Sequence, residues 1–135
     1  MRDIVVVGSL NVDVSLSATR LPAPGETVRA QGRELGPGGK GCNQAIAAAR
    51  LGARVHMVGW LGDDAFAEIP QLALERAGVD ATYVERAAGH ATGTATIVVS
   101  SQSGENQIAV FAGANREVSS DHVHSALAAF RASSV

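Results

Sequence analysis

The sequence predicts an α/β protein: a parallel sheet covered by helices, with a second, smaller sheet standing off it. Residues 4–7 form a continuous apolar run and residues 55–60 are mostly apolar, the pattern of strands buried on both faces, and helix-like segments alternate with them. Such alternation indicates a parallel sheet. The runs at 11–16, 26–35 and 94–111 have one polar face, so they predict a separate sheet with one solvent-facing side.

Three helices are expected around these strands, each bounded by residues typical of helix ends. They cover residues 43–51, 66–77 and 121–131. Asp63 and Asp64 could cap the second helix, which contains Pro70. Because proline removes a helical hydrogen bond, we expect a loose turn before Pro70 or a kink at it.

The composition excludes several classes of protein. At 135 residues, with 46% hydrophobic and 18% charged residues, the chain has the balance of one globular domain. Its net charge of −2 and its scattered basic residues give no reason to expect a nucleic-acid partner. A single cysteine, Cys42, and dispersed histidines predict neither a disulfide nor a metal site. The apolar runs are too short for a signal peptide or a membrane span, so we expect a soluble, cytoplasmic protein with no membrane partner.

The segment Gly36–Gly41 (GPGGKG) matches the pattern G-x-G-x-x-G of dinucleotide-binding loops, and Asp63 follows about 20 residues later, where such sites place an acid. In a dinucleotide fold, however, the loop comes directly after the first buried strand, where this chain has residues 8–11. Lys40 is also not followed by the Ser or Thr of a phosphate-binding P-loop. The context therefore argues against a dinucleotide site.

The glycine-rich segment and the polar residues near it still favour an oxygen-rich ligand. Glycines before a helix allow close backbone approach, and the helix start has free N–H groups. Asn43 adds a carboxamide there, while Asn11 and Asp13 lie two residues apart on one side of a strand. An Asp beside an Asn suits a vicinal diol, since each charge-assisted hydrogen bond contributes about 1.5–3 kcal/mol. The alternative that Asn11 and Asp13 only cap a turn stays open.

Lys40 and Cys42 each have two interpretations. Lys40 could contact a phosphate, or it could be a solvated or structural residue. Cys42, near a helix N-terminus, could have a lowered pKa, or it could be a small buried packing residue.

Several motifs together resemble the ribokinase-like carbohydrate kinases. Gly38–Ala45 (GGKGCNQA), followed by Gly52 and Gly62, resembles the N-terminal signature of that family. Gly8–Asp13 (GSLNVD) resembles its opening strand and sugar-binding segment. Further short motifs fall where the family has them: Pro24–Thr27, Gly62–Asp64, Gly78–Asp80, Thr92–Gly93, Gly104–Asn106 and Gly113–Asn115.

This resemblance implies a doubly wound, Rossmann-like α/β domain in which the second sheet (strands 11–16, 26–35 and 94–111) is a lid over a sugar. It implies an ATP-dependent sugar kinase that phosphorylates the hydroxymethyl group of ribose or a related sugar, with Mg2+ and a monovalent cation as cofactors. It also implies a homodimer formed through the lid. Carried over by position, the sugar-binding residues would be Asn11, Asp13, Gly39, Lys40, Gly41 and Asn43.

In this family the catalytic base and the nucleotide and cation sites lie in the C-terminal half, and no matching glycine-rich segment occurs later in this sequence. Residues 1–135 are therefore expected to be the N-terminal portion of one sugar-kinase domain, without a catalytic residue and inactive alone. The alternative is a non-catalytic module that binds a sugar or forms a dimer. Deoxyribose, fructose and nucleosides stay open as substrates besides ribose.

Overall fold

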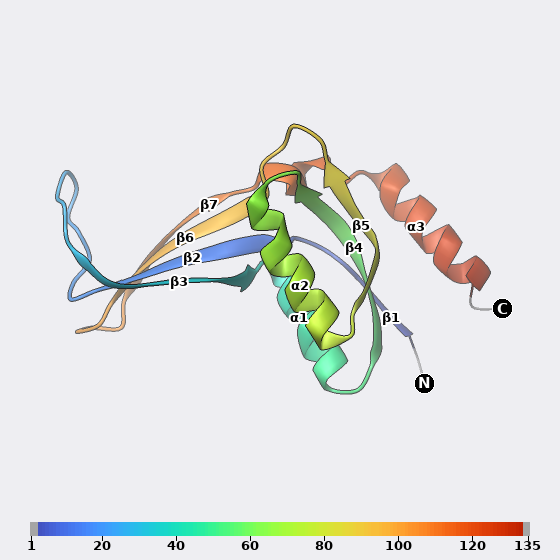
Figure 1. Ribbon diagram of the computed structural model, residues 1–135, viewed down its shortest axis with the longest axis horizontal. Helices are drawn as coiled ribbons and strands as arrows, with labels where there is room; N and C mark the ends of the chain where they lie inside the picture. The colour runs from blue at the N-terminus through green and yellow to red at the C-terminus, as the bar shows by residue number, and fades with distance from the viewer. Residues whose placement is uncertain (1–2, 134–135) are drawn as a thin grey trace.

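The computed structural model describes residues 3–133, which form two β-sheets and three α-helices (Figure 1). The parallel sheet, in the order β1-β4-β5, consists of β1 (Asp3–Val7), β4 (Arg54–Gly62) and β5 (Asp80–Ala87). The second sheet, in the order β3-β2-β6-β7, consists of β2 (Asn11–Ala18), β3 (Ala30–Gly38), β6 (Gly93–Ser100) and β7 (Asn106–Phe111). The helices are α1 (Lys40–Arg50), α2 (Glu68–Ala77) and α3 (Ser120–Ser133), with short 3-10 helices η1 (Ala65–Ala67) and η2 (Gly113–Glu117). None of the described helices is long and apolar enough to cross a membrane.

Helices α1 and α2 cover one face of the parallel sheet, and α3 lies on the other (Figure 1). Alternate residues of β4 point to opposite faces. Met57 and Leu61 are fully buried in the core formed with α1 and α2, whereas the ring of Trp60 contacts that of His122 in α3. The buried core residues are Leu10, Cys42, Ala45, Ile46, Val55, Met57, Leu61, Ala67, Leu74 and Val79. This packing fixes where α1 begins relative to the sheet.

The two-sheet α/β architecture is confirmed, but both outer strands of the parallel sheet differ from the prediction. β1 is not buried on both faces: it is an edge strand of the described sheet, and Ile4 and Val7 are 40% and 44% exposed. β5 has no counterpart among the predicted strands, because the apolar residues of its sequence (DATYVERA) have irregular spacing. Edge strands need less apolar surface, so the apolar pattern indicates them poorly.

The glycine-rich segment is divided between a strand and a helix. The strand predicted over 26–35 begins only at Ala30 and continues to Gly38, and α1 begins at Lys40 instead of Asn43. Gly39 alone joins them, with a φ of 89°, a conformation that residues with side chains rarely adopt. The segment is therefore a sharp corner between strand and helix.

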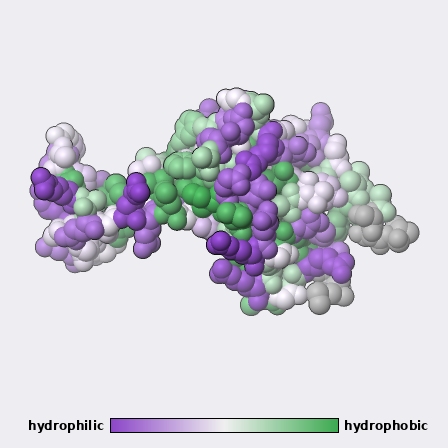
Figure 2. Space-filling model, in the orientation of Figure 1, coloured by the Kyte–Doolittle hydropathy of each residue, from purple (hydrophilic) through white to green (hydrophobic). Residues whose placement is uncertain are grey.

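The second sheet is mixed and projects away from the parallel sheet (Figure 1). β2 pairs in parallel with β6, while β3 and β7 are antiparallel neighbours on the outside. The register places Asn11 between Gly38 of β3 and Gly93 of β6. Hydrophobic residues gather on the surface where this sheet meets the body of the molecule (Figure 2). The exposed large apolar residues of β7 are Ile108, Val110 and Phe111.

Two carboxylates hold the chain where it crosses from the parallel sheet to the second sheet. Oδ2 of Asp63 accepts a hydrogen bond from the backbone N–H of Gly89 at 2.8 Å. Asp64 accepts from the N–H and the hydroxyl of Thr92 at 2.9 and 2.6 Å, and that hydroxyl accepts from the N–H of Gly62 at 3.1 Å. Asp64 occupies the N-cap position of η1, but neither η1 nor α2 has a side-chain hydrogen bond that caps its start. The two carboxylates fix the residues before β6 against the end of β4 instead.

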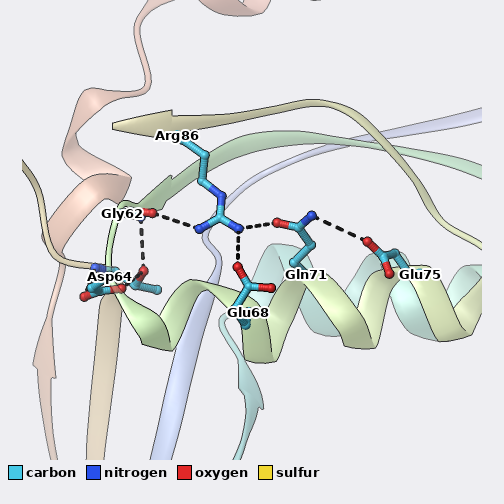
Figure 3. Close-up of polar contacts among 7 residues, drawn as sticks. Gly62, Asp64, Glu68, Gln71, Glu75 and Arg86 are labelled. Atoms are coloured by element: carbon cyan, nitrogen blue, oxygen red, sulfur yellow. Dashed lines mark hydrogen bonds and ion pairs between the residues drawn. The ribbon is translucent and has the colours of Figure 1, made fainter. Parts of the chain in front are cut away.

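The start of α2 is tied to the same end of the parallel sheet by Arg86 (Figure 3). Its guanidinium donates to the carbonyl of Gly62 at 3.2 Å, to Glu68 at 3.0 Å, and also to Gln71. Pro70 lies in the first turn of α2, where an N–H has no helical partner, and η1 precedes it. The turn expected before Pro70 is therefore confirmed.

Candidate functional site

A pocket of about 410 Å³ lies where the start of α1 meets the second sheet. Its polar lining residues are Ser9, Asn11, Asp13, Lys40, Asn43 and Asn115. Its apolar lining comes mainly from β6, β7 and the residue after β7: Ala95, Ile97, Ile108, Val110 and Ala112. A second cavity of about 410 Å³ lies along β2 and β3, but no helix start and no carboxamide faces it. The pocket at α1 is therefore the better candidate for a specific ligand.

Close backbone packing at the corner before α1 shapes one side of the pocket. A Cβ on Gly41 would lie 2.7 Å from the carbonyl carbon of Gly8, and one on Gly39 would lie 2.6 Å from the carbonyl oxygen of Ser9. The N–H of Cys42 donates to the same Ser9 oxygen at 3.0 Å. Of the predicted site residues, Gly39 lines the pocket, whereas Gly41 is buried inside the corner and does not. Gly41 therefore acts by allowing this close approach.

Asn11 and Asp13 both face the pocket from β2, as their spacing predicts. Because both lie within a strand, the turn-capping alternative is wrong. A Cβ on Gly38 would lie 1.9 Å from Oδ1 of Asp13, so the glycine leaves the space that the carboxylate occupies. Burial raises the pKa of Asp13, and no hydrogen bond or cation within residues 3–133 counteracts this effect. The carboxylate therefore offers unpaired acceptor atoms to a ligand.

Asn115 is a pocket residue that was not among the predicted site residues. Its Oδ1 accepts from the N–H of Leu10 at 2.9 Å, and its Nδ2 donates to Oδ1 of Asn11 at 2.8 Å and to the carbonyl of Ala112 at 2.9 Å. Nothing local in the sequence shows that this amide reaches a residue 104 positions earlier. The one available signal is the motif Gly113–Asn115, which reads as a turn.

The other predicted residues lie in the first turn of α1. Lys40 and Asn43 are exposed and line the pocket. Cys42 is fully buried, and its burial, together with the nearby charge of Asp13, raises its pKa to about 11. The low-pKa alternative for Cys42 is therefore wrong, and the residue belongs to the core.

Together these groups form a site suited to a small ligand with several hydroxyl groups. The carboxylate accepts hydrogen bonds, the carboxamides both donate and accept, and the N–H groups at the start of α1 favour oxygen atoms. The apolar residues of β6 and β7 can contact the C–H groups of such a ligand. Within the described part of the chain, no three His, Cys, Asp or Glu side chains are placed to hold a metal ion.

The sequence matches the family described as pfkB family carbohydrate kinase over residues 1–135. The chain therefore belongs to this family of carbohydrate kinases, and the resemblance found in its motifs is confirmed.

Three relatives illustrate the similarity. The chain is 42% identical to ribokinase of Bacillus subtilis (strain 168) over 127 residues, which cover 94% of this chain and 43% of that protein. It is 40% identical to deoxyribokinase of Salmonella typhi over 121 residues, covering 90% of this chain and 39% of the relative. A solved structure of Arabidopsis thaliana ribokinase complexed with ribose and ATP is 38% identical, with a TM-score of 0.74 over 83% of this chain and 36% of that one. The chain thus spans less than half the length of each relative.

Proposed function

We propose that this chain is the sugar-binding part of an ATP-dependent kinase that phosphorylates the hydroxymethyl group of ribose or a related sugar. The observation that carries this proposal is the convergence of Asn11, Asp13 and Asn43 on one pocket at the start of α1. Membership of a carbohydrate-kinase family and similarity to a ribokinase complexed with ribose and ATP support it. Similarity to a deoxyribokinase keeps deoxyribose among the candidate sugars.

Each polar group has its own role in this proposal. Asp13 accepts hydrogen bonds from neighbouring ring hydroxyls, because its carboxylate has no competing partner among residues 3–133. Asn11 and Asn43 bind further hydroxyls from β2 and from α1. The backbone at Gly39 approaches the sugar closely, and Lys40 adds a positive charge at the edge of the pocket.

The second sheet acts as the lid over the sugar, through the side chains that β6 and β7 contribute to the pocket. Covering the sugar with apolar residues excludes water, so that phosphate is transferred to the sugar and ATP is not hydrolysed.

Ile108 and Val110 are 55% and 66% exposed in the outer strand β7. Because open strands with exposed apolar residues are often buried across a two-fold axis, we also propose a homodimer formed through this sheet.

The groups that bind ATP, Mg2+ and a monovalent cation lie outside residues 1–135 in this proposal. Phosphoryl transfer requires a held γ-phosphate, neutralised charge and a base near the attacking hydroxyl. The described carboxylates near the pocket have other roles: Asp13 binds hydroxyls, while Asp63 and Asp64 hold the crossing between the sheets. Residues 1–135 alone are therefore expected to be inactive.

Release of ADP from Mg-ATP in the presence of D-ribose tests this proposal. The full-length protein is expected to release ADP only with the sugar, and Asp13→Asn is expected to abolish most of this turnover at low ribose concentration. Asp121→Asn, at an exposed position of α3, is the matched control and should leave it unchanged. Sugar-independent ADP release, with neither ribose nor deoxyribose stimulating it, would contradict the proposal. Ribose-dependent turnover by residues 1–135 alone would place a base within this segment.

A further inference from the structure

The side-chain amide of Asn115 forms hydrogen bonds through both its oxygen and its nitrogen within the protein. Besides its bonds to Asn11 and Ala112, Nδ2 lies 3.2 Å from the carbonyl oxygen of Leu10, so one side chain engages both backbone groups of that residue. These bonds join the first residue of β2 to η2, the segment that follows β7. Asn115 therefore connects the start of β2 to the residues that follow β7, beside the pocket.

The direction of these hydrogen bonds is set by a backbone group. The N–H of Leu10 can only donate, so the atom of Asn115 that faces it must be the oxygen. Nδ2 of Asn115 then faces Asn11, and because Nδ2 can only donate, the atom of Asn11 opposite it must also be the oxygen. The Nδ2 group of Asn11 is consequently the end of its amide that remains for a ligand.

We propose that Asn115 is a positioning residue that fixes the amide of Asn11 with its N–H groups toward the ligand, so that Asn11 donates to the sugar while Asp13 accepts from it. This inference rests on the proposed function of the pocket and deepens it, because it assigns a hydrogen-bonding direction to each polar group. A ligand oxygen at Asn11 needs a lone pair, whereas the neighbouring oxygen at Asp13 needs a hydrogen. Adjacent hydroxyls of a sugar satisfy both requirements.

The neighbouring strand is shaped around this pair of amides. A Cβ on Gly93 would lie 2.2 Å from Nδ2 of Asn115 and 2.3 Å from Oδ1 of Asn11, the two atoms that form the bond. The φ of Gly93 is not positive, so the backbone there would accept another residue. A glycine is therefore required at position 93 because a side chain would occupy the space of the Asn115–Asn11 hydrogen bond, and not because of the backbone conformation.

A double-mutant cycle in the full-length protein tests whether Asn115 acts through Asn11. KM and kcat for D-ribose are measured with Mg-ATP for Asn11→Ala, Asn115→Ala and the double variant, and thermal unfolding is recorded for each. Asn11→Ala and Asn115→Ala are each expected to raise KM about tenfold with a smaller change in kcat, since each loses a directed hydrogen bond to the sugar. The double variant should have the KM of Asn11→Ala alone, because Asn115 affects sugar binding only by orienting the amide of Asn11.

Gly93→Ala, which by itself leaves both amides in the chain, provides a second cycle with Asn11→Ala. It should raise KM when Asn11 is present and have no further effect on KM in the Asn11→Ala background. If Asn115→Ala or Gly93→Ala raises KM by the same factor in both backgrounds, or lowers only the unfolding temperature, the inference is overturned while the proposed function stands. If the unsubstituted protein shows no ribose-dependent turnover, the proposed function fails and the inference fails with it.

Discussion

The carboxylate of Asp13 occupies the space in which a side chain at position 38 would lie: a Cβ on Gly38 would be 1.9 Å from Oδ1 of Asp13. Gly38→Ala is therefore expected to displace this carboxylate and to raise KM for ribose about tenfold or more, because charge-assisted hydrogen bonds to the sugar are lost. Gly36→Ala in the same strand is the matched control, since a Cβ there has no atom within 4 Å. Steady-state kinetics with D-ribose compare the two, and equal KM values would contradict the assignment of Asp13.

Asp13→Asn should raise the unfolding temperature at pH 7 even though it is expected to weaken the binding of ribose. Burial raises the pKa of Asp13, so the folded state disfavours its ionised form. The stability linked to this raised pKa is fully present below the ordinary value of 3.8 and is lost as the pH rises through the raised value. The asparagine variant cannot ionise, so its unfolding temperature should exceed that of the unsubstituted protein at pH 7, and the difference should disappear near pH 3. Circular dichroism during heating measures this, and an unfolding temperature lowered at pH 7 would refute the prediction.

Thr92→Val should weaken the attachment of the second sheet. The hydroxyl of Thr92 bonds to both Asp64 and the N–H of Gly62, so its loss is expected to lower the free energy of unfolding by about 1–3 kcal/mol at pH 7. Urea unfolding measures this change. Thr96→Val, at an exposed position of β6, is the control and should have little effect.

The cost of Thr92→Val should also depend on pH. Burial raises the pKa of Asp64, but the hydrogen bonds from Thr92 and from nearby backbone groups outweigh this effect, so the pKa is lowered overall. The stability linked to a lowered carboxyl pKa is present above the ordinary value of 3.8 and is lost as the pH falls through the folded-state value. The destabilisation should therefore be smaller at pH 3 than at pH 7. An equal cost at both pH values would show that the charge of Asp64 is not involved.

The proposed homodimer can be tested on the two faces of β7. Val110 is 66% exposed and lines the pocket, whereas the neighbouring Ala109 is exposed on the opposite face of the strand. Val110→Lys is expected to convert the full-length dimer to a monomer, because it places a charge on the exposed apolar face of β7 through which the two subunits are proposed to contact each other. Ala109→Lys should leave the dimer intact. Light scattering distinguishes these outcomes. If the unsubstituted protein is a monomer at high concentration, the proposed homodimer is wrong.

Local sequence spacing was sufficient to predict part of the pocket. Asn11 and Asp13 are two residues apart in a strand, so the pleat alone puts them on the same side. Glycines before an alanine-rich run indicated the start of α1, which brings Asn43 to the same place. Both features depend only on residues close together in the sequence, so the spacing of those residues is enough to predict them.

The parts that could not be predicted depend on contacts between distant segments. Asn115 lies in what reads as a turn, and its role follows from an amide bond to Asn11 that only the assembled sheet creates. Gly39 and Gly41 look equivalent in the sequence, yet one lines the pocket and the other packs against Gly8. The partners of Asp64 were missed for the same reason, since Thr92 lies 28 residues away.

The parallel pairing of β2 with β6 determines when the pocket can form. Residues 11–18 leave the ribosome before their partner strand, which covers residues 93–100, and a loop of the intervening chain must close before the two can pair. Until then the side of β2 that bears Asn11 and Asp13 has no neighbour at Gly93 and no amide from Asn115. The site therefore cannot exist before residues 93–115 are available to pair with β2. The pocket is expected to be among the last parts of these residues to become ordered during folding.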